Sequence, residues 1–456
     1  MSRPQWVPDA VFYQIFPDRF RNGRPDLDPP DVAPWGAEPD QIRFQGGDLR
    51  GINEGLSHLE WLGASAIYLN PIFTAGTNHR YDTHDYFGID PRLGDLGEFR
   101  ELVAEAHRRG IRVVLDGVFN HCGDGHPAFV DWNKNRSSGE HAGWFLGWPG
   151  PQPAGEPDYQ TCGGASYLPK LNTNNPAVKD HLLRCATYWV EKTGIDGWRL
   201  DVPWKVEGGF WDDFMKTMET LAPDVYVVGE MWRDATGYLD VFDGCMNYQQ
   251  RAAILDYCLL DVMDGEDFMI EIEDLLRRHG AAAPWMLNLI GSHDTSRVLT
   301  LADGDIERVC LAFTALFTLP GSPMIYYGDE VGLTGSGDPS CRKAMPWDPD
   351  RWDTRILEHV RTLTAVRGKH DVLRRGALRR VVERNGMAIY RRQHEHQEML
   401  VVINPRGAQQ DVRIEASGER WRDLLSDRTY PVVDGEVVID QVAAKTSLIL
   451  VETRAA

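Results

Sequence analysis

Three short apolar segments of the sequence each end in a carboxylate. They are Ile195–Asp201, Val225–Glu230 and Met286–Asp294. In a barrel of parallel strands the C-terminal ends of the strands meet on one face, and active sites are built on that face. Two carboxylates placed there can cleave a glycosidic bond, one as the nucleophile and the other as the proton donor. The pattern therefore predicts a glycosidase whose acids come from strand ends.

A fourth strand-like segment also ends in polar residues. It carries Asp116, followed by Asn120 and His121, and Arg199 stands two residues before Asp201. Each of these residues alone has an ordinary structural explanation, as a helix cap, an ion-pair partner or a buried histidine with satisfied hydrogen bonds. Four strand ends that all carry reactive side chains, in order along the chain, favour a catalytic site.

Eight short apolar segments alternate with helical stretches, as expected for strands that are covered on both faces. The expected strands are Val11–Phe16, Ala66–Asn70, Arg112–Gly117, Gly197–Asp201, Tyr226–Glu230, Phe242–Asn247, Leu287–Ser292 and Met324–Tyr327. Helices are expected at Leu96–Arg109, Ala177–Lys192 and Phe210–Leu221. This alternation predicts the α/β class and a (β/α)8 TIM barrel with insertions.

Two regions depart from a plain barrel. Residues 121–175, after the third strand, are rich in Gly, Pro, Trp and Asn and predict a loop-like subdomain above the barrel mouth. After about Arg375 the pattern changes to period-two alternation, which predicts a C-terminal antiparallel β domain. Its expected strands are Ala388–Arg392, Met399–Asn404, Val412–Glu415 and Ser447–Val451. The predicted domains are thus a barrel of residues 1–120 and 176–374, an inserted subdomain of 121–175 and a β domain of 375–456.

The composition is that of a soluble globular protein, with 42% apolar and 25% charged residues. The formal charge is 48 minus 68, or −20, which argues against nucleic acid or an anionic membrane as a partner and agrees with a neutral substrate. The most membrane-like stretch, Val309–Tyr327, is interrupted by Pro320-Gly321. It is predicted to be a buried helix followed by a buried strand.

The seven cysteines include no Cys-x-x-Cys pair, and the sequence shows no basic start followed by an apolar core. The cysteines are therefore expected to be reduced and mostly buried thiols, which indicates a cytoplasmic protein.

Taken together, the motifs resemble those of the α-amylase superfamily, glycoside hydrolase family 13. The matching segments are DGVFNH (116–121), GWRLD (197–201), GE (229–230) followed by Met-Trp, and GSHD (291–294). The similarity extends through GGDLRG (46–51), NHRYDTHDYFGID (78–90), LPKLN (168–172), YYGDE (326–330) and CRKAMPWD (341–348). LPKLN is more similar to the MPKLN form of the neopullulanase, cyclomaltodextrinase and maltogenic amylase group than to the QPDLN form of oligo-1,6-glucosidases.

The resemblance implies a role for each acid. Asp201 is expected to be the nucleophile and Glu230 the acid and base, while Asp294 would hold the 2- and 3-hydroxyls of the sugar. A retaining pair lies about 5–5.5 Å apart. Arg199 is expected to keep Asp201 ionised while Glu230 stays protonated near neutral pH.

The resemblance also implies sugar contacts. His121 and His293 would donate hydrogen bonds to hydroxyls, and Tyr81 would stack on the ring at the cleaved bond. Asp116 is expected to organise Arg199, with plain scaffolding as the alternative.

Flat aromatic rings cover sugar faces, although most tryptophans pack in the core. Trp232 is the first candidate for an acceptor-side platform and Trp204 the second, whereas Trp189 and Trp198 are expected to be packing residues.

Two departures from the group bear on substrate choice. The group usually carries an additional N-terminal β domain that helps to form a dimer, whereas here the barrel is expected to begin at Val11. This difference leaves two properties open: the preference for cyclodextrins and the oligomeric state. After the nucleophile the group has Asp-Val-Ala-Asn-Glu, whereas this chain has Asp201-Val-Pro-Trp-Lys205, which leaves the ratio of hydrolysis to transfer open.

A third departure concerns calcium, which some relatives bind through an Asn-Gly-Asp-Pro-x-Asn-Asp loop and a Gly-Gly-Asp. The residues that could form such a site here are Asn22, Asp26, Asp28, Gly46 and Asp48. Two oxygen ligands are missing and Arg24 has been introduced, which is unfavourable for a cation that needs several oxygens. No cofactor is expected to be required, and calcium is not favoured.

The leading interpretation is a retaining α-glucan hydrolase that cleaves α-1,4 bonds in maltooligosaccharides, cyclodextrins or starch-type glucans, with some transglycosylation. The alternative within enzymes is an exo-acting α-glucosidase. A non-catalytic carbohydrate-binding scaffold of the same fold predicts the loss of at least one catalytic acid, and none is lost. The expected partner is a neutral α-glucan oligosaccharide, without nucleic acid or membrane.

Overall fold

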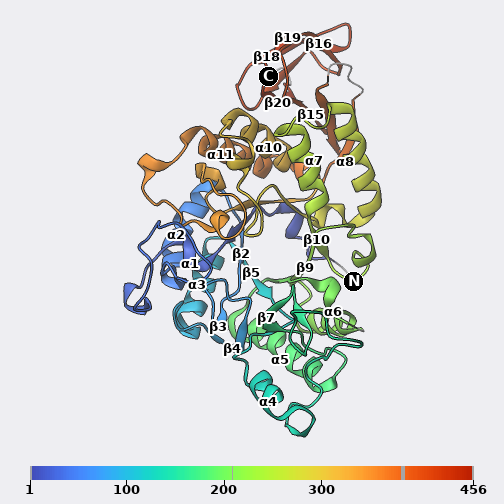
Figure 1. The fold of residues 1–456 in the computed structure, drawn as a ribbon. Coiled ribbons are helices and arrows are strands. Elements are labelled where there is room, and N and C mark those ends of the chain that lie inside the picture. Colours follow the sequence, from blue (N-terminus) through green and yellow to red (C-terminus); the bar gives the residue numbers. More distant parts are fainter. Residues whose placement is uncertain (1–2, 208, 382–385, 454–456) are drawn as a thin grey trace.

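The structure is a computed structural model that describes residues 3–207, 209–381 and 386–453. The outermost residues of the predicted barrel and β domain (1–2 and 454–456), together with 208 and 382–385, lie outside the described residues. In the described part, parallel strands close into a barrel in the order of the chain (Figure 1). They are β1 (Phe12–Ile15), β2 (Ala66–Leu69), β5 (Arg112–Gly117), β8 (Gly197–Leu200), β9 (Tyr226–Met231), β10 (Gly244–Asn247), β11 (Leu287–Leu289) and β12 (Ser322–Tyr326). Each predicted barrel strand is confirmed.

Helices surround the barrel, and local sequence signals set their ends. The longer ones are α2 (Leu49–Leu62), α3 (Leu96–Arg108), α5 (Pro176–Thr193), α6 (Phe210–Leu221), α7 (Tyr248–Cys258), α8 (Gly265–His279), α10 (Ile306–Thr318) and α11 (Thr354–Lys369). The shorter ones are α1 (Pro17–Phe20), α9 (Val298–Leu301) and α12 (Asp371–Arg375). Helix α3 starts at a capping box between Asp95 and Glu98, and α5 starts at Asn175 and stops at the left-handed Gly194. The three predicted helices are confirmed.

The apolar stretch Val309–Tyr327 is a buried helix, α10, that leads into the buried strand β12, as predicted. Over the described ranges, no helix combines the length and the apolar character that crossing a bilayer requires.

The inserted segment 121–175 contains short elements: α4 (Pro127–Asn135), β6 (Thr161–Cys162) and β7 (Ala165–Pro169). An antiparallel pair that the sequence analysis did not foresee, β3 (Phe73–Ala75) and β4 (Thr83–Ile89), lies beside it. Figure 1 shows α4, β7 and α5 together at the lower end of the molecule.

The chain ends in an antiparallel sheet, which Figure 1 shows at the opposite end. Its strands are β13 (Ala377–Arg380), β14 (Ala388–His394), β15 (Gln397–Asn404), β16 (Gln409–Glu415), β17 (Arg420–Asp423), β18 (Thr429–Val433), β19 (Glu436–Val442) and β20 (Thr446–Glu452). The four predicted strands correspond to β14, β15, β16 and β20. The analysis missed β13, β17, β18 and β19, and β13 and β18 have no fully buried residue and so lack a clear apolar signal.

Strand periodicity places the polar residues at one height inside the barrel. The lower interior is an apolar cluster that includes Phe12, Tyr68, Val114 and Val228. Side chains two residues apart on a strand point to the same face. The next inward positions toward the C-terminal ends are therefore occupied by Gln14, Asn70, Asp116 and Glu230, all buried.

Candidate active site

The guanidinium of Arg199 is fully buried and contacts three carboxylates. Its Nη1 lies 2.9 Å from Asp116 Oδ1 and 2.9 Å from Asp201 Oδ1, and its Nη2 lies 3.1 Å from Glu230 Oε2. The three acids come from β5, from the end of β8 and from β9. One cation thus connects the acids that the sequence analysis had placed on neighbouring strand ends.

The charge balance differs from the sequence-based expectation. Burial raises the pKa of Asp201 well above its ordinary value; Arg199 opposes this shift, and the negative charges of Glu230, Asp116 and Asp294 add to it. The expectation that Arg199 keeps Asp201 ionised considers the guanidinium alone. Because burial and three nearby carboxylates act in the opposite direction, the free site favours a protonated Asp201 at a higher pH than an ordinary aspartate.

Glu230 is held by two neutral donors besides Arg199. The backbone N–H of Val202 donates to Oε2 at 2.9 Å, and the indole Nε1 of Trp232 donates to Oε1 at 2.6 Å. Val202 has φ 36°, in the left-handed region that β-branched residues rarely adopt. The strained turn directly follows Asp201, so the same short segment carries the expected nucleophile and orients the expected proton donor.

Asp116 organises the floor of the site. The hydroxyls of Tyr68 and Tyr81 donate to its Oδ2 at 2.6 and 2.8 Å, and both of its oxygens accept from Arg199. The ring of Tyr81 lies parallel to that of His293, 5.5 Å away and tilted by 8°. Burial raises the pKa of Asp116.

The hydrogen bonds of His293 assign its tautomer. Gln14 Nε2 donates to Nδ1 at 2.8 Å, so the ring proton is on Nε2, which lies 2.6 Å from the Tyr81 hydroxyl and 3.1 Å from Asp294 Oδ2. Burial lowers the pKa of His293 well below its ordinary value. The ring is therefore neutral, and its Nε2 proton faces Tyr81 and Asp294.

His121 is neutral for the same reason, since burial lowers its pKa to about 3. Asn120 Nδ2 lies 3.2 Å from its Nδ1, which places the ring proton on Nε2. That atom is buried and has no hydrogen-bond partner among the described residues. It is a donor that a sugar hydroxyl could satisfy.

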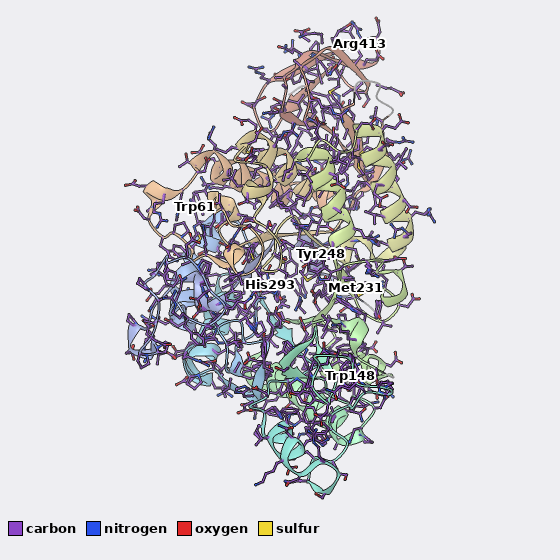
Figure 2. The ribbon with its side chains drawn as sticks, viewed as in Figure 1. Trp61, Trp148, Met231, Tyr248, His293 and Arg413 are labelled. Atoms are coloured by element: carbon purple, nitrogen blue, oxygen red, sulfur yellow. The ribbon has the colours of Figure 1, made fainter. Side chains whose placement is uncertain are left out.

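These side chains surround a cavity of about 350 Å³ in the middle of the molecule, where Figure 2 labels His293 and Tyr248. Of the residues singled out from sequence, Tyr81, His121, Asp201, Glu230, Trp232, His293 and Asp294 line it. Asp116 and Arg199 do not line it: Arg199 contacts the lining acids Asp201 and Glu230, and Asp116 contacts Arg199 and Tyr81. Larger hollows of about 460 to 570 Å³ lie against the C-terminal sheet and contain none of these acids.

Sequence reasoning missed part of the lining. The additional residues are His79, Cys162, Tyr167, Leu168, Val202, Asp338 and Arg342. Arg342 lies 3.2 Å from Asp294 and 3.0 Å from Asp338. His79 and Arg342 belong to two segments that carried the family resemblance and could have been found there. Cys162 and Tyr167 reach the cavity only through the β6–β7 hairpin.

Of the four tryptophans singled out from the sequence, the two predicted to be packing residues are buried and the two platform candidates are exposed. Trp232 is 41% exposed and stacks on Tyr248, with ring centroids 4.0 Å apart. Trp189 and Trp198 are buried packing residues. Trp204 is exposed and does not line the cavity, so the second candidate for a platform is not part of this wall.

The candidate calcium loop does not fit a cation. The oxygens of Asp48 accept three backbone N–H groups, from Gly23, Arg24 and Gly51, each at 2.7 Å. The Arg24 side chain pairs with Asp26 and with Glu98.

The remaining residues of that loop are also engaged with one another. The amide nitrogen of Asn22 donates to both oxygens of Asp28, and a side chain at Gly46 would collide with them. Over the described ranges, no group of three or more His, Cys, Asp or Glu side chains is arranged to hold a metal.

Comparisons with known proteins show the family to which this chain is related. Residues 14–354 match the family described as alpha amylase, catalytic domain. A cyclomaltodextrinase from Bacillus sp is 44% identical over 409 residues, which are 88% of this chain and 73% of that protein. Neopullulanase 2 from Thermoactinomyces vulgaris is 40% identical over 437 residues, 93% of this chain and 74% of that protein. The solved structure of cyclic alpha-maltosyl-(1→6)-maltose hydrolase from Arthrobacter globiformis, in complex with its substrate, has a TM-score of 0.90 and 42% identity and covers 99% of this chain and 100% of that one.

Proposed function

This chain belongs to the α-amylase family of glycoside hydrolases, and on that premise we propose that it hydrolyses α-1,4-glucosidic bonds with retention of configuration at the site built around Arg199. The observation that carries the proposal is the contact of one buried guanidinium with Asp201 and Glu230 at the wall of a single cavity. A retaining mechanism needs two carboxyl groups that flank the scissile bond, close enough for one to attack the sugar while the other protonates the departing oxygen.

The roles follow from position. Asp201 attacks the anomeric carbon and forms a glycosyl-enzyme, while Glu230 gives its proton to the departing oxygen. Glu230 then removes a proton from the incoming water, which releases the sugar and regenerates Asp201. His121 and His293, both neutral donors, bind hydroxyls of the sugar, and Asp294 accepts from others.

The supporting groups keep this geometry. Asp116 holds Arg199, and Trp232 and Val202 hold Glu230 through the hydrogen bonds described above. Trp232 also offers an exposed ring face beyond the acid, which suits an acceptor sugar.

The substrate class comes from the relatives. Maltooligosaccharides and cyclodextrins are the first candidates, since a cyclomaltodextrinase and a neopullulanase align over most of this chain. A second candidate is a cyclic maltosyl-maltose, because the hydrolase of that ring aligns over 99% of this chain and 100% of its own length. The neutral partner agrees with the net charge of −20.

Product analysis distinguishes these substrates. The enzyme is offered β-cyclodextrin, cyclic α-maltosyl-(1→6)-maltose, pullulan and maltotriose separately, and products are followed with time. Ring opening followed by maltose would support the endo-acting hydrolase and show which ring is preferred. Glucose released one unit at a time from maltotriose, with both rings intact, would identify an exo-acting α-glucosidase instead.

Two further proposals concern the setting of the enzyme. We propose that it needs no calcium, because backbone N–H groups engage the carboxylate of Asp48 and Arg24 pairs with Asp26. We also propose a cytoplasmic location, because the seven cysteines are free thiols and five are buried. Cell fractionation with an antibody tests the second.

A further inference from the structure

Four histidines lie along the boundary between the barrel and the inserted segment 121–175. We call this set the histidine boundary. It consists of His84 on β4, His126 at the start of α4, His141 in the loop after α4, and His181 on α5. The rings of His126 and His181 are 5.7 Å apart and perpendicular, and Trp144 packs on His141 and His181 at 4.9 and 5.4 Å.

The neutral form of His126 is needed for the local structure. Its Nδ1 accepts a hydrogen bond from the backbone N–H of Ala128 at 3.2 Å and so caps α4. A proton on Nδ1 would remove this acceptor. Burial, together with the neighbouring His181, His141 and His84, lowers the pKa of His126 to about 3.

The charged groups around the boundary do not compensate a charge on His126. Asp131 of α4 pairs with His141 at 2.8 Å, and Asp82 lies 3.8 Å from His84 Nε2. The groups that face His181 are Arg184, which lowers its pKa along with burial, and Asp85 and Asp180, which raise it, with a net lowering. The Nε2 atoms of His84 and His181 are buried without a hydrogen-bond partner in the described part of the chain.

The histidine boundary is connected to the cavity by one short segment. Residues 121–126 run from His121, which lines the cavity, to the cap of α4. Within this segment the N–H groups of Cys122 and Asp124 donate to the carbonyls of Pro169 and Tyr167, at 3.2 and 3.1 Å. The segment therefore holds strand β7, which supplies Tyr167 and Leu168 to the cavity wall. Figure 1 shows α4, α5 and β7 as neighbours.

We propose that the histidine boundary is an acid-sensitive latch: with neutral rings it holds β7 against the active site, and protonation of His126 and His181 releases that wall and stops hydrolysis reversibly. The release of β7 is argued from the contacts of the histidine boundary and does not depend on any enzymatic activity. Only the loss of hydrolysis rests on the proposed function.

The direction of the pH dependence follows from linkage. An opened boundary exposes the histidines to water, where they take up protons near their ordinary pKa of about 6.5. The closed form keeps them neutral to a lower pH, so acid favours the open form. Below pH 6.5 the open population should rise about tenfold per pH unit for one such histidine and about a hundredfold for two.

Amide hydrogen exchange of the full-length enzyme, without substrate, tests the latch. Between pH 6 and pH 5, after correction for intrinsic exchange rates, opening of residues 161–169 should increase with a slope between one and two protons, while the barrel strands stay protected. The variant His126→Asn keeps a capping side chain that does not titrate, and the slope should fall to one proton or less. The double variant with His181→Gln should lose the dependence.

The control is His396→Asn, an exposed histidine of the C-terminal sheet, which should behave as wild type. The proposal would be overturned if amide exchange at residues 161–169 did not depend on pH. It would also be overturned if exchange in His126→Asn depended on pH as steeply as in the wild type. If the double variant does not fold, the single variant and the wild-type slope still decide. The exchange measurement needs no substrate, so it tests the latch independently of activity. If the protein did not hydrolyse glucans, the proposed function would be wrong, and the pH dependence of exchange would still decide whether the latch exists.

Discussion

The indole of Trp232 donates a hydrogen bond to the carboxyl of Glu230 at 2.6 Å, while its ring lies flat on Tyr248. A residue expected to serve as a sugar platform is thus also a positioning group for the proton donor. Two functions in one side chain can be separated by substitution.

The variant Trp232→Phe keeps an aromatic face and removes the donor. Loss of one hydrogen bond to a carboxyl, worth about 1–2 kcal/mol, should lower kcat about 5–30-fold with little change in KM for maltotriose. Trp232→Ala should also raise KM. Steady-state kinetics distinguishes the two, and an unchanged kcat in the Phe variant would show that the hydrogen bond does not position the acid.

Asp201→Asn removes the expected nucleophile. Turnover should fall by at least about 10³-fold, since no glycosyl-enzyme can form, while maltooligosaccharide binding persists. Isothermal titration calorimetry and rate measurements on the same preparation check this. Near-normal turnover would exclude Asp201 as the nucleophile.

The same variant should be more stable than the wild type at neutral pH. Because the pKa of Asp201 is raised in the folded state, the folded protein binds a proton that the unfolded chain has released, and stability falls as pH rises from about 4 toward the raised pKa. Asparagine has no charge to bury, so Tm should rise by about 1–3 °C at pH 7.5. The difference should vanish near pH 4, which thermal unfolding at both pH values can show.

Lys205 lies where the group of relatives has a carboxylate and contacts Cys162 at 3.8 Å. Lys205→Glu should change the ratio of transfer products to hydrolysis products from maltotriose, because the charge next to the cavity wall is reversed. Lys179→Glu, at a half-buried position of α5 that does not line the cavity, is the control. Equal ratios in wild type and Lys205→Glu would mean that Lys205 does not act on the acceptor.

Calcium should not affect the enzyme. Tm and kcat should be the same in excess EDTA and in millimolar calcium chloride, since Arg24 and backbone N–H groups already engage the loop carboxylates. Differential scanning calorimetry gives the answer directly, and a rise in Tm with calcium would contradict the proposal.

The sequence predicts the fold well because its strongest signals are local. The barrel strands are short apolar runs, and strand periodicity then fixes the height of Asp116 and Glu230. Two of the strands that escaped prediction, β13 and β18, have no buried residues to create a pattern.

The site was predictable where single segments carry the signal and not where distant segments meet. Asp201, Glu230 and Asp294 lie at or shortly after the ends of recognisable strands, whereas Cys162 and Tyr167 reach the cavity only once a hairpin has folded over it. The charge state of Asp201 also depends on burial, which Arg199 in the sequence cannot reveal.

The cavity wall has two independent sources. The reacting acids stand on barrel strands fixed by the core, whereas Cys162, Tyr167 and Leu168 stand on a hairpin outside the barrel. The catalytic acids and the hairpin part of the cavity wall are therefore encoded in separate stretches of the chain. Such modularity means that an exchange of residues 121–175 for the corresponding stretch of another family member could redirect the enzyme to a different glucan while leaving its catalytic chemistry in place.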